Sequence, residues 1–287
     1  MEYRIERYKN CRRFNEQYER IYRFLLEAEK LEYNEHFHWG RFEWMHAHSY
    51  LDEDKLTSIV MFKDENDVIV GLTTYDTGYD DRVYLIHTSS DKVLLERMVD
   101  TVLEAESNVA VIKANAKDEV LCWILQEKGF EKKHRCDCIL SLDLSNPLEY
   151  SMPDAYTMSP QGFVTDPWQY QLVIHKGFDN EGIPDKWEDE FLKRIPHANE
   201  DLKTFAITNN EYCAHCGLCT QRATPPMLNL LQPSPSTESK AWQKRLFTKH
   251  VTVQMHVVLS VPLLFPTKSF ITELVLHFLR KCMVGKN

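Results

Sequence analysis

Glycine is scarce in this chain, which has only 9 among its 287 residues. Average usage of about 7% would predict roughly 20. No three of these glycines have the G-x-G-x-x-G spacing of a dinucleotide-binding loop. Gly177 and Gly182 have the spacing of a P-loop, but Ile183 follows where that loop requires lysine. The sequence therefore excludes a Rossmann fingerprint and a P-loop.

Long apolar runs and an excess of basic residues are also missing. The chain has no run of 18 apolar residues, so we expect no transmembrane helix and no membrane partner. The start, MEYRIERYKNCRRF, is charged and lacks the apolar core of a secretory signal. The net charge of −9 argues against a nucleic-acid partner. We therefore expect a cytoplasmic protein whose 8 cysteines stay reduced.

The charge balance changes abruptly near Cys219. Residues 219–287 contain two acidic side chains and nine Lys or Arg, a net charge of +7. Residues 1–218 contain 41 acidic and 25 basic side chains, a net charge of −16. The last 69 residues also hold 6 of the 12 prolines and only one glycine. A solvated basic tail is the simplest explanation, but the change falls in the middle of an expected strand.

Hydrophobic periodicity predicts alternating strands and helices in the first half. The expected strands are 3–9, 58–62, 68–75, 82–87, 109–112 and 135–144. The expected helices are 14–30, the second half of 34–48, 94–103 and 118–128. Residues 88–91 should cap the third helix, and Gly129 should close the fourth. This order predicts an α/β unit with a mixed sheet, of the α+β kind, over residues 1–145.

The pattern restarts after an expected linker at 146–154. A strand at 156–158, helical segments at 168–175 and 187–195, and a hairpin of 205–208 with 212–218 are predicted. Gly71-Leu72 and Gly217-Leu218 occupy second strands of two predicted hairpins, 146 residues apart. We therefore expect two tandem domains, the second readable only from 155 to 218 and followed by the divergent segment 219–287.

The element order, the helix ending in Gly129-Phe130 and the strand after it resemble the GNAT superfamily of acyl-CoA N-acyltransferases. The two-copy layout is similar to tandem GNAT proteins. In that family, a Q/R-x-x-G-x-G/A loop at a helix N-terminus holds the pyrophosphate of CoA. Thr88, Ser89 and Ser90 stand at this place in the first domain, without glycine. The family's tyrosine acid, four residues before the glycine of the Gly-Phe pair, is replaced by Leu125. The resemblance thus implies a first domain without its cofactor loop.

The missing loop of the second domain can be read from another frame. With synonymous codons, residues 220–244 give YTEGDTAYVEPVAAIPEYRKQGLAK one frame over. This string contains P-E-Y-R-K-Q-G-L-A, which resembles the pyrophosphate loop of the family. Residues from 256 to about 275 can give RGAKRAIVVSDQEFYYRIGF, with a tyrosine four residues before the glycine of a Gly-Phe pair. Our hypothesis is a single-base deletion at the Leu218/Cys219 junction, in the gene or in its determined sequence.

The resemblance implies an acetyl-CoA-dependent N-acetyltransferase that modifies a small-molecule or protein amine, with acetyl-CoA as co-substrate and no metal. No catalytic residue can be assigned in the printed chain, which leaves open whether this chain itself is active. In the family, the region corresponding to the H-K-G-F-D-N-E-G loop lines the acceptor pocket. That correspondence points to His175, Lys176, Phe178, Asp179 and Asn180. A plain solvated loop is the alternative.

Two other functions remain open. One is a non-catalytic GNAT-like binding or structural protein. The other is a metal-binding protein using Cys213, Cys216 and Cys219 with His215 and the distant Cys282, since thiolates at this spacing suit zinc or an iron–sulfur cluster. The first two lie on a predicted strand, where side chains three residues apart point to opposite faces, so we favour structural cysteines. For His36, His38, His46 and His48 we likewise favour packing over metal binding.

Overall fold

The structure is a computed structural model that forms two compact units. One unit contains residues 1–134 and 193–197, and the other contains 135–192 and 198–287. The structure describes residues 2–9, 14–47, 51–76, 79–105, 111–132, 139–140, 156–160, 162–177, 181–184, 196–197, 203–219, 227–231 and 254–256. Among the helices of these residues, none combines the length and the apolar character of a membrane span. The predicted linker and the predicted helix at 187–195 lie outside the described residues.

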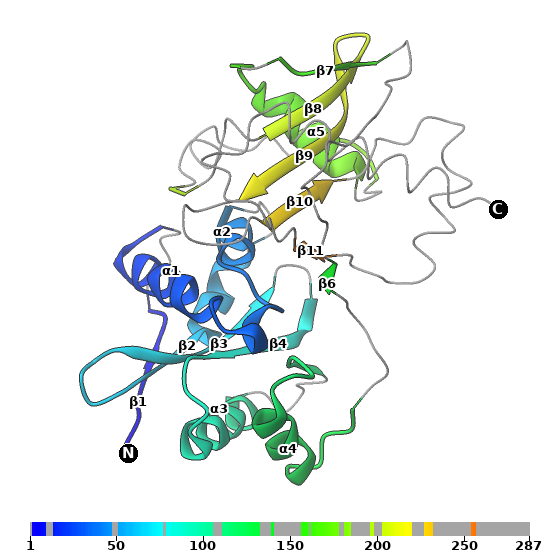
Figure 1. Cartoon of the computed structure of the whole chain (residues 1–287). Coiled ribbons are helices and arrows are strands. Elements are labelled where there is room, and N and C mark those ends of the chain that lie inside the picture. The colour runs from blue at the N-terminus through cyan, green and yellow to red at the C-terminus, as the bar shows by residue number, and fades with distance from the viewer. Residues whose placement is uncertain are drawn as a thin grey trace, which may run out of the picture. The chain divides into compact units, whose positions relative to one another are not determined.

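The first unit is built on a five-stranded mixed sheet in the order β1-β2-β3-β4-β5 (Figure 1). Its strands are β1 (Arg4–Arg7), β2 (Val60–Lys63), β3 (Ile69–Asp76), β4 (Tyr79–His87) and β5 (Val111–Lys113). Neighbours from β1 to β4 run antiparallel, whereas β4 and β5 run parallel. The mixed sheet with both helices and strands confirms the predicted α+β class.

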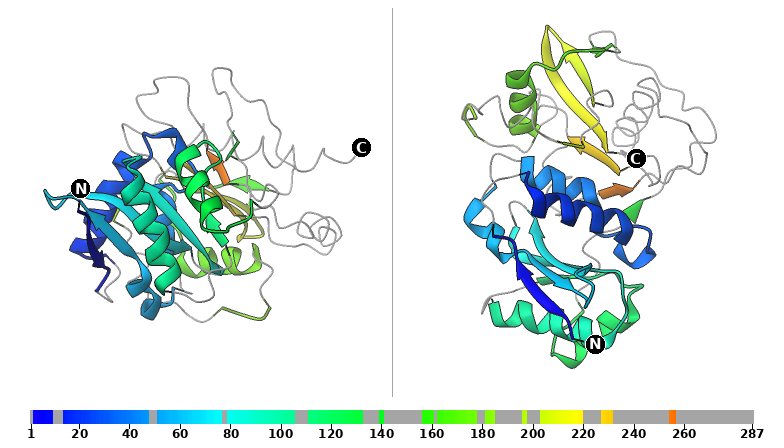
Figure 2. Two further views of the ribbon diagram at one scale, coloured as in Figure 1. Left: turned by 90° about the horizontal axis from the view of Figure 1, so that it is seen from below. Right: turned by 90° about the vertical axis from the view of Figure 1, so that its left-hand side faces the viewer.

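Helices cover both faces of this sheet. They are α1 (Glu16–Ala28), α2 (Trp39–Ala47), α3 (Lys92–Ala105) and α4 (Glu119–Glu127), with short 3-10 helices η1 (Glu32–Asn34) and η2 (Glu53–Ser58). Two of them, α1 and α2, lie on one face, and α3 and α4 lie on the other (Figures 1 and 2). The order of strands and α-helices follows the sequence prediction through α4.

Local sequence signals explain where these helices begin and end. The Asn15 side chain accepts a hydrogen bond from the Tyr18 backbone N–H at 2.9 Å and caps α1. The predicted closure of α4 by Gly129 is confirmed, because this residue has a φ of 86°. The N–H groups of Gly129 and Phe130 donate to the carbonyls of Gln126 and Leu125, which is a Schellman motif.

A close approach between β3 and α3 organises the core on one face of the sheet. A Cβ atom added to Gly71 would lie 2.8 Å from Met98 Sδ and 3.3 Å from Phe62 Cβ. Any larger residue at this position would therefore require the Met98 side chain to move. The surrounding core consists of Val60, Phe62, Leu85, Leu94, Leu95, Met98, Val99, Val102, Leu121, Ile124 and Leu125.

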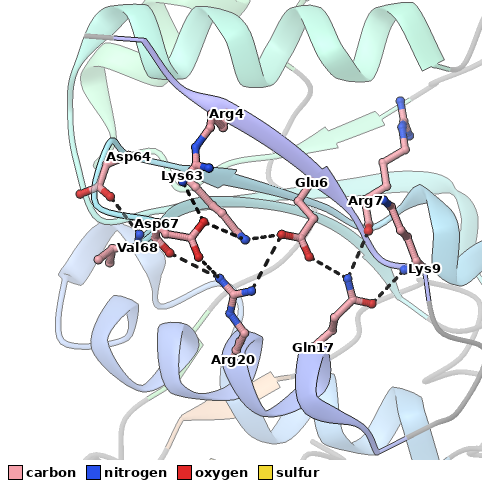
Figure 3. A network of polar contacts seen from close by, with 10 residues as sticks. All are labelled: Arg4, Glu6, Arg7, Lys9, Gln17, Arg20, Lys63, Asp64, Asp67 and Val68. Carbon is pink, nitrogen blue, oxygen red and sulfur yellow. Dashed lines mark hydrogen bonds and ion pairs between the residues drawn. The ribbon is translucent and has the colours of Figure 1, made fainter.

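Charged side chains tie β1, α1 and the β2–β3 turn together (Figure 3). Asp67, in this turn, has a φ of 64° and pairs with Arg4 at 2.8 Å and Arg20 at 3.3 Å. The Lys63 ammonium contacts Asp67 and Glu6. Hydrogen bonding to Lys63 lowers the pKa of the Asp67 carboxyl, and the neighbouring cations add to the effect. Through Arg20, the network links β1 and the β2–β3 turn to α1.

The second unit contains a sheet in the order β6-β11-β10-β9-β8-β7 and the helix α5 (Pro167–Gly177). Its strands are β6 (Ile139–Leu140), β7 (Thr157–Met158), β8 (Lys203–Thr208), β9 (Glu211–Cys219), β10 (Met227–Leu231) and β11 (Gln254–His256). Asn209 and Asn210 join β8 to β9 with φ values of 49° and 62°. Positive values at both positions are those of a type I′ hairpin turn, which confirms the predicted hairpin.

The two units repeat one order of strands. In the first, β1 pairs with β2, β2 with β3 and β3 with β4, always antiparallel. In the second, β7 pairs with β8, β8 with β9 and β9 with β10, again antiparallel. Gly71 lies on β3 and Gly217 on β9, the third strand of each series. The shared order covers four strands in each unit, because β5 runs parallel to β4 whereas β11 runs antiparallel to β10.

Candidate functional site

The first unit brings polar side chains together where β4 and β5 end. These strands are parallel, with Arg82 opposite Val111 and Tyr84 opposite Lys113. Ligands of open α/β sheets commonly bind outside the carboxyl ends of such strands. His87 is the last residue of β4, and Asp118 follows β5 and precedes α4. A ligand-binding site is therefore expected at this edge.

His87 and Asp118 form a buried pair at this edge. The His87 Nε2 atom lies 2.5 Å from Asp118 Oδ2, and the two side chains are only 1% and 5% exposed. An ionised carboxylate only accepts hydrogen bonds, so Nε2 carries the donated proton. The other Asp118 oxygen accepts from the Leu121 backbone N–H at 3.1 Å. One carboxylate thus caps α4 and anchors the end of β4.

Two residues of the 3-10 helix η1, Tyr33 and Asn34, also contact His87. The Tyr33 ring stacks on the His87 ring, with centroids 4.7 Å apart and planes 17° from parallel. Asn34 Nδ2 donates to the His87 carbonyl at 2.7 Å and to the Ala28 carbonyl at 2.9 Å. Burial raises the pKa of the Tyr33 phenol; a hydrogen bond with Ser90 opposes this effect and the charge of Asp118 adds to it. We call His87, Asp118, Tyr33 and Asn34 the β4–β5 edge cluster.

In the edge cluster, an imidazole (His87) is oriented by a carboxylate (Asp118), which is a common arrangement of a general base. His87 Nδ1 has no hydrogen-bond partner among the described residues. With the proton on Nε2, this atom is an acceptor, and Asp118 holds the ring in place. However, the His87 side chain is almost completely buried, so a ligand would reach it only after the surrounding loops moved. In this structure, the His87–Asp118 pair connects the end of β4 to the beginning of α4.

The predicted cofactor residues lie directly beside this cluster, in the turn from β4 to α3. The Thr88 N–H donates to the Val70 carbonyl at 3.0 Å. Ser89 Oγ accepts from the Asp91 N–H at 3.2 Å, and Ser90 is exposed. Asp91 Oδ1 accepts from the Val93 N–H at 3.0 Å. The amino end of α3 is therefore occupied by oxygens of the chain itself, one of them from a carboxylate.

The predicted acceptor residues begin in the last turn of α5. His175 is buried, with Nε2 3.1 Å from the Glu181 carbonyl, and Lys176 is exposed. A carbonyl accepts only, so Nε2 donates in this contact. Phe178, Asp179 and Asn180 lie outside the described residues. The structure therefore places His175 against its own loop and Lys176 toward solvent.

All three cysteines of the C-x-x-C-x-x-C sequence fall on β9, whereas the prediction placed only Cys213 and Cys216 on a strand. Cys213 is half-buried, its Sγ lies 3.3 Å from the Glu211 carbonyl, and burial raises the pKa of its thiol. Cys282 and the side chains of Cys216 and Cys219 lie outside the description. Where side chains are described, no group of three or more His, Cys, Asp or Glu is arranged to hold a metal ion.

Three histidines of the aromatic segment, His36, His38 and His46, pack within the first unit. His36 has ring nitrogens near the carbonyls of Tyr33 and Leu85, and burial lowers its pKa to about 4. His38 Nε2 lies 3.1 Å from a Glu29 carboxylate oxygen. His46 packs against aromatic rings such as that of Phe42, with a centroid distance of 4.3 Å. His48 lies outside the described residues.

Comparison with known proteins finds no matching family model and no matching curated protein. Sequence reasoning missed the edge cluster, although two signals pointed to it. His87 ends a predicted strand, and Asp118 begins a predicted helix. A parallel arrangement of the strands preceding them would have placed both residues at one edge. The contribution of Tyr33 and Asn34 had no such signal, because η1 was not predicted.

Proposed function

We propose that the gene specifies a tandem GNAT-type N-acetyltransferase, which uses acetyl-CoA to acetylate an amine. The observation that carries this proposal is the position of β10. This strand is the fourth in its series, as β4 is in the first unit. The alternative frame reads Y-V-E-P-V over the residues of β10, then A-A-I, and then P-E-Y-R-K-Q-G-L-A. In this reading, three residues separate β10 from the string that resembles a pyrophosphate loop, which supports the proposal.

The residues of the printed chain do not fit acetyl-CoA in either unit. In the first, the carboxylate of Asp91 occupies the amino end of α3 and would repel a pyrophosphate. In the second, the stretch 219–284 contains no glycine for a close approach of the backbone to a phosphate. We therefore derive no catalytic step for this polypeptide. The proposed acetyl transfer belongs to the protein with the alternative frame restored.

A second function is favoured for the first unit taken alone. The Asp91 cap and the closed His87–Asp118 pair suit a GNAT-like domain that binds or shapes a partner site without holding CoA. This non-catalytic role is compatible with a catalytic second unit. It would become the function of the whole protein if the printed frame were the natural one.

The DNA at the Leu218/Cys219 junction tests the proposal. We expect one missing base, whose restoration continues the open frame through both GNAT-like strings. Independent sequencing of the genomic DNA and of the expressed plasmid distinguishes a natural deletion from an error in the determined sequence. An intact gene whose other frames encode no such strings would overturn the proposed acetyltransferase.

A further inference from the structure

The first unit holds the imidazole of His197 in a recess between α1 and α2. Pro196 and His197 are described members of the segment 193–197, which belongs to this unit. Tyr18, Glu19 and Tyr22 come from α1, and Glu43 comes from α2. We call these four residues the α1–α2 recess. Its occupant is separated from α1 by about 175 residues of sequence, so the contact is not a local consequence of the chain.

Two aromatic rings of the recess lie nearly parallel to the ring of His197. The His197 ring stacks on the Tyr22 ring, with centroids 3.7 Å apart and planes only 5° from parallel. The Tyr18 ring is also nearly parallel to it, at 6.4 Å and 11°. Tyr18 is fully buried and is fixed by stacking on Phe42 at 5.5 Å. Tyr18 is therefore held by a contact that does not involve His197.

Carboxylates line the edges of the recess. Glu19 Oε1 lies 3.2 Å from His197 Nε2, which must donate because a carboxylate only accepts. Glu43 is 2% exposed, and its Oε1 accepts from the His197 backbone N–H at 3.2 Å. Its Oε2 accepts from the Tyr18 hydroxyl at 2.8 Å. The recess thus combines an aromatic face with one carboxylate that accepts from the ring and another that accepts from the backbone of the same residue.

We propose that the α1–α2 recess is a binding site for a flat, N–H-bearing heteroaromatic ring of the imidazole class, and that His197 fills it as a tethered internal ligand. Aromatic faces and carboxylates both favour a ring of this kind when it is protonated. A tethered ring is present at an effective concentration in the millimolar range, so it competes with free ligands that bind with a Kd in this range. Loss of His197 therefore opens the site. The proposal does not depend on acetyl transfer.

Calorimetric titration of the full-length His197→Ala variant with imidazole at neutral pH tests this site. We expect binding with a Kd on the order of 1 mM, and at least about twofold weaker binding by the unmodified chain, in which the tethered ring competes. Thiazole is the matched probe, since it is a flat ring of the same size without an N–H group, and it should bind at least tenfold more weakly. Tyr22→Leu in the His197→Ala background should abolish imidazole binding. Equal binding of imidazole to both chains, or equal binding of thiazole, would overturn the proposal.

A second readout keeps His197 in place and so does not depend on the folding of the alanine variant. Stacking on Tyr22 should shift the ring C–H proton resonances of His197 upfield in the NMR spectrum. Tyr22→Leu should move them toward their values in an unstructured peptide, whereas Tyr33→Leu, the matched control, should leave them in place. Resonances of His197 at unstructured values in the unmodified chain would refute the recess.

Discussion

His87 Nε2 lies 2.5 Å from Asp118 Oδ2 and links the end of β4 to the beginning of α4. The two residues are 31 positions apart, and the parallel pairing of β4 with β5 brings them together. Asp118 also accepts the Leu121 N–H, so its two oxygens serve two elements. The pair is consequently a central structural connection of the first unit.

Substitution of Asp118 tests this connection. Asp118→Ala leaves the buried His87 N–H without its acceptor and removes the cap of α4, so we expect a loss of about 3 kcal/mol in the free energy of unfolding. Asp118→Asn is the matched control, because asparagine also caps helices and can hydrogen-bond to His87, and should cost about 1 kcal/mol. Urea unfolding followed by near-ultraviolet circular dichroism measures both. Equal losses for alanine and asparagine would contradict the dual role.

His215 should make the second unit sensitive to acid. It lies on β9 against Phe205 and Tyr170, and burial lowers its pKa to about 3. The unfolded chain binds a proton below about pH 6.5, whereas the folded chain stays neutral, so stability is full above pH 6.5 and falls as the pH decreases toward 3. We expect a loss of about 2 kcal/mol between pH 8 and pH 5 from this residue.

The His215→Leu variant isolates this effect. All other titrating groups remain, so the difference in unfolding free energy between variant and unmodified chain should change by about 2 kcal/mol between pH 8 and pH 5, in favour of the variant at low pH. Urea unfolding at the two pH values provides the comparison. Parallel pH dependences of the two proteins would show that His215 is not buried as a neutral ring.

The approach of α3 to Gly71 gives a third test. Gly71→Ala would press a Cβ atom against Met98 Sδ and Phe62 Cβ, and we expect it to cost about 2 kcal/mol. Shortening Met98 to alanine should relieve part of this clash, so the double variant should cost at least about 1 kcal/mol less than the sum of the single changes.

Gly129→Ala serves as the matched glycine control. Its Cβ would meet no atom within 4 Å, but the backbone φ of 86° is unfavourable for alanine. It should cost about 1 kcal/mol and add to the effect of Met98→Ala without coupling. Urea unfolding measures these free energies. If the losses from Gly71→Ala and Met98→Ala also add without coupling, the side chains at the two positions do not compete for space.

Much of the first unit followed from the sequence because its signals were local. The periodicity of α1 and the closure of α4 by Gly129 each depend on neighbouring residues. The turn at Asn209 and Asn210 was recognisable for the same reason, since asparagine tolerates positive φ. Such features require no knowledge of distant contacts.

The candidate sites were less accessible to sequence reasoning. The pairing of His87 with Asp118 depends on which strands are parallel, and the stacking of His197 on Tyr22 joins residues 175 positions apart. The segment 139–140 likewise pairs with β11 of the second sheet, which no periodicity indicates. Contacts of this kind arise from the tertiary arrangement and leave no pattern in a single sequence.

Titration of acetyl-CoA into two full-length proteins, the printed chain and the chain with the alternative frame restored after Leu218, tests the central claim most directly. Isothermal calorimetry should detect a single site with a Kd on the order of 10 μM in the restored protein, because the glycine-containing loop after the fourth strand supplies backbone N–H groups to the pyrophosphate. The printed chain should show no binding at the same concentrations. Equal binding by both proteins, or no binding by the restored one, would contradict the account.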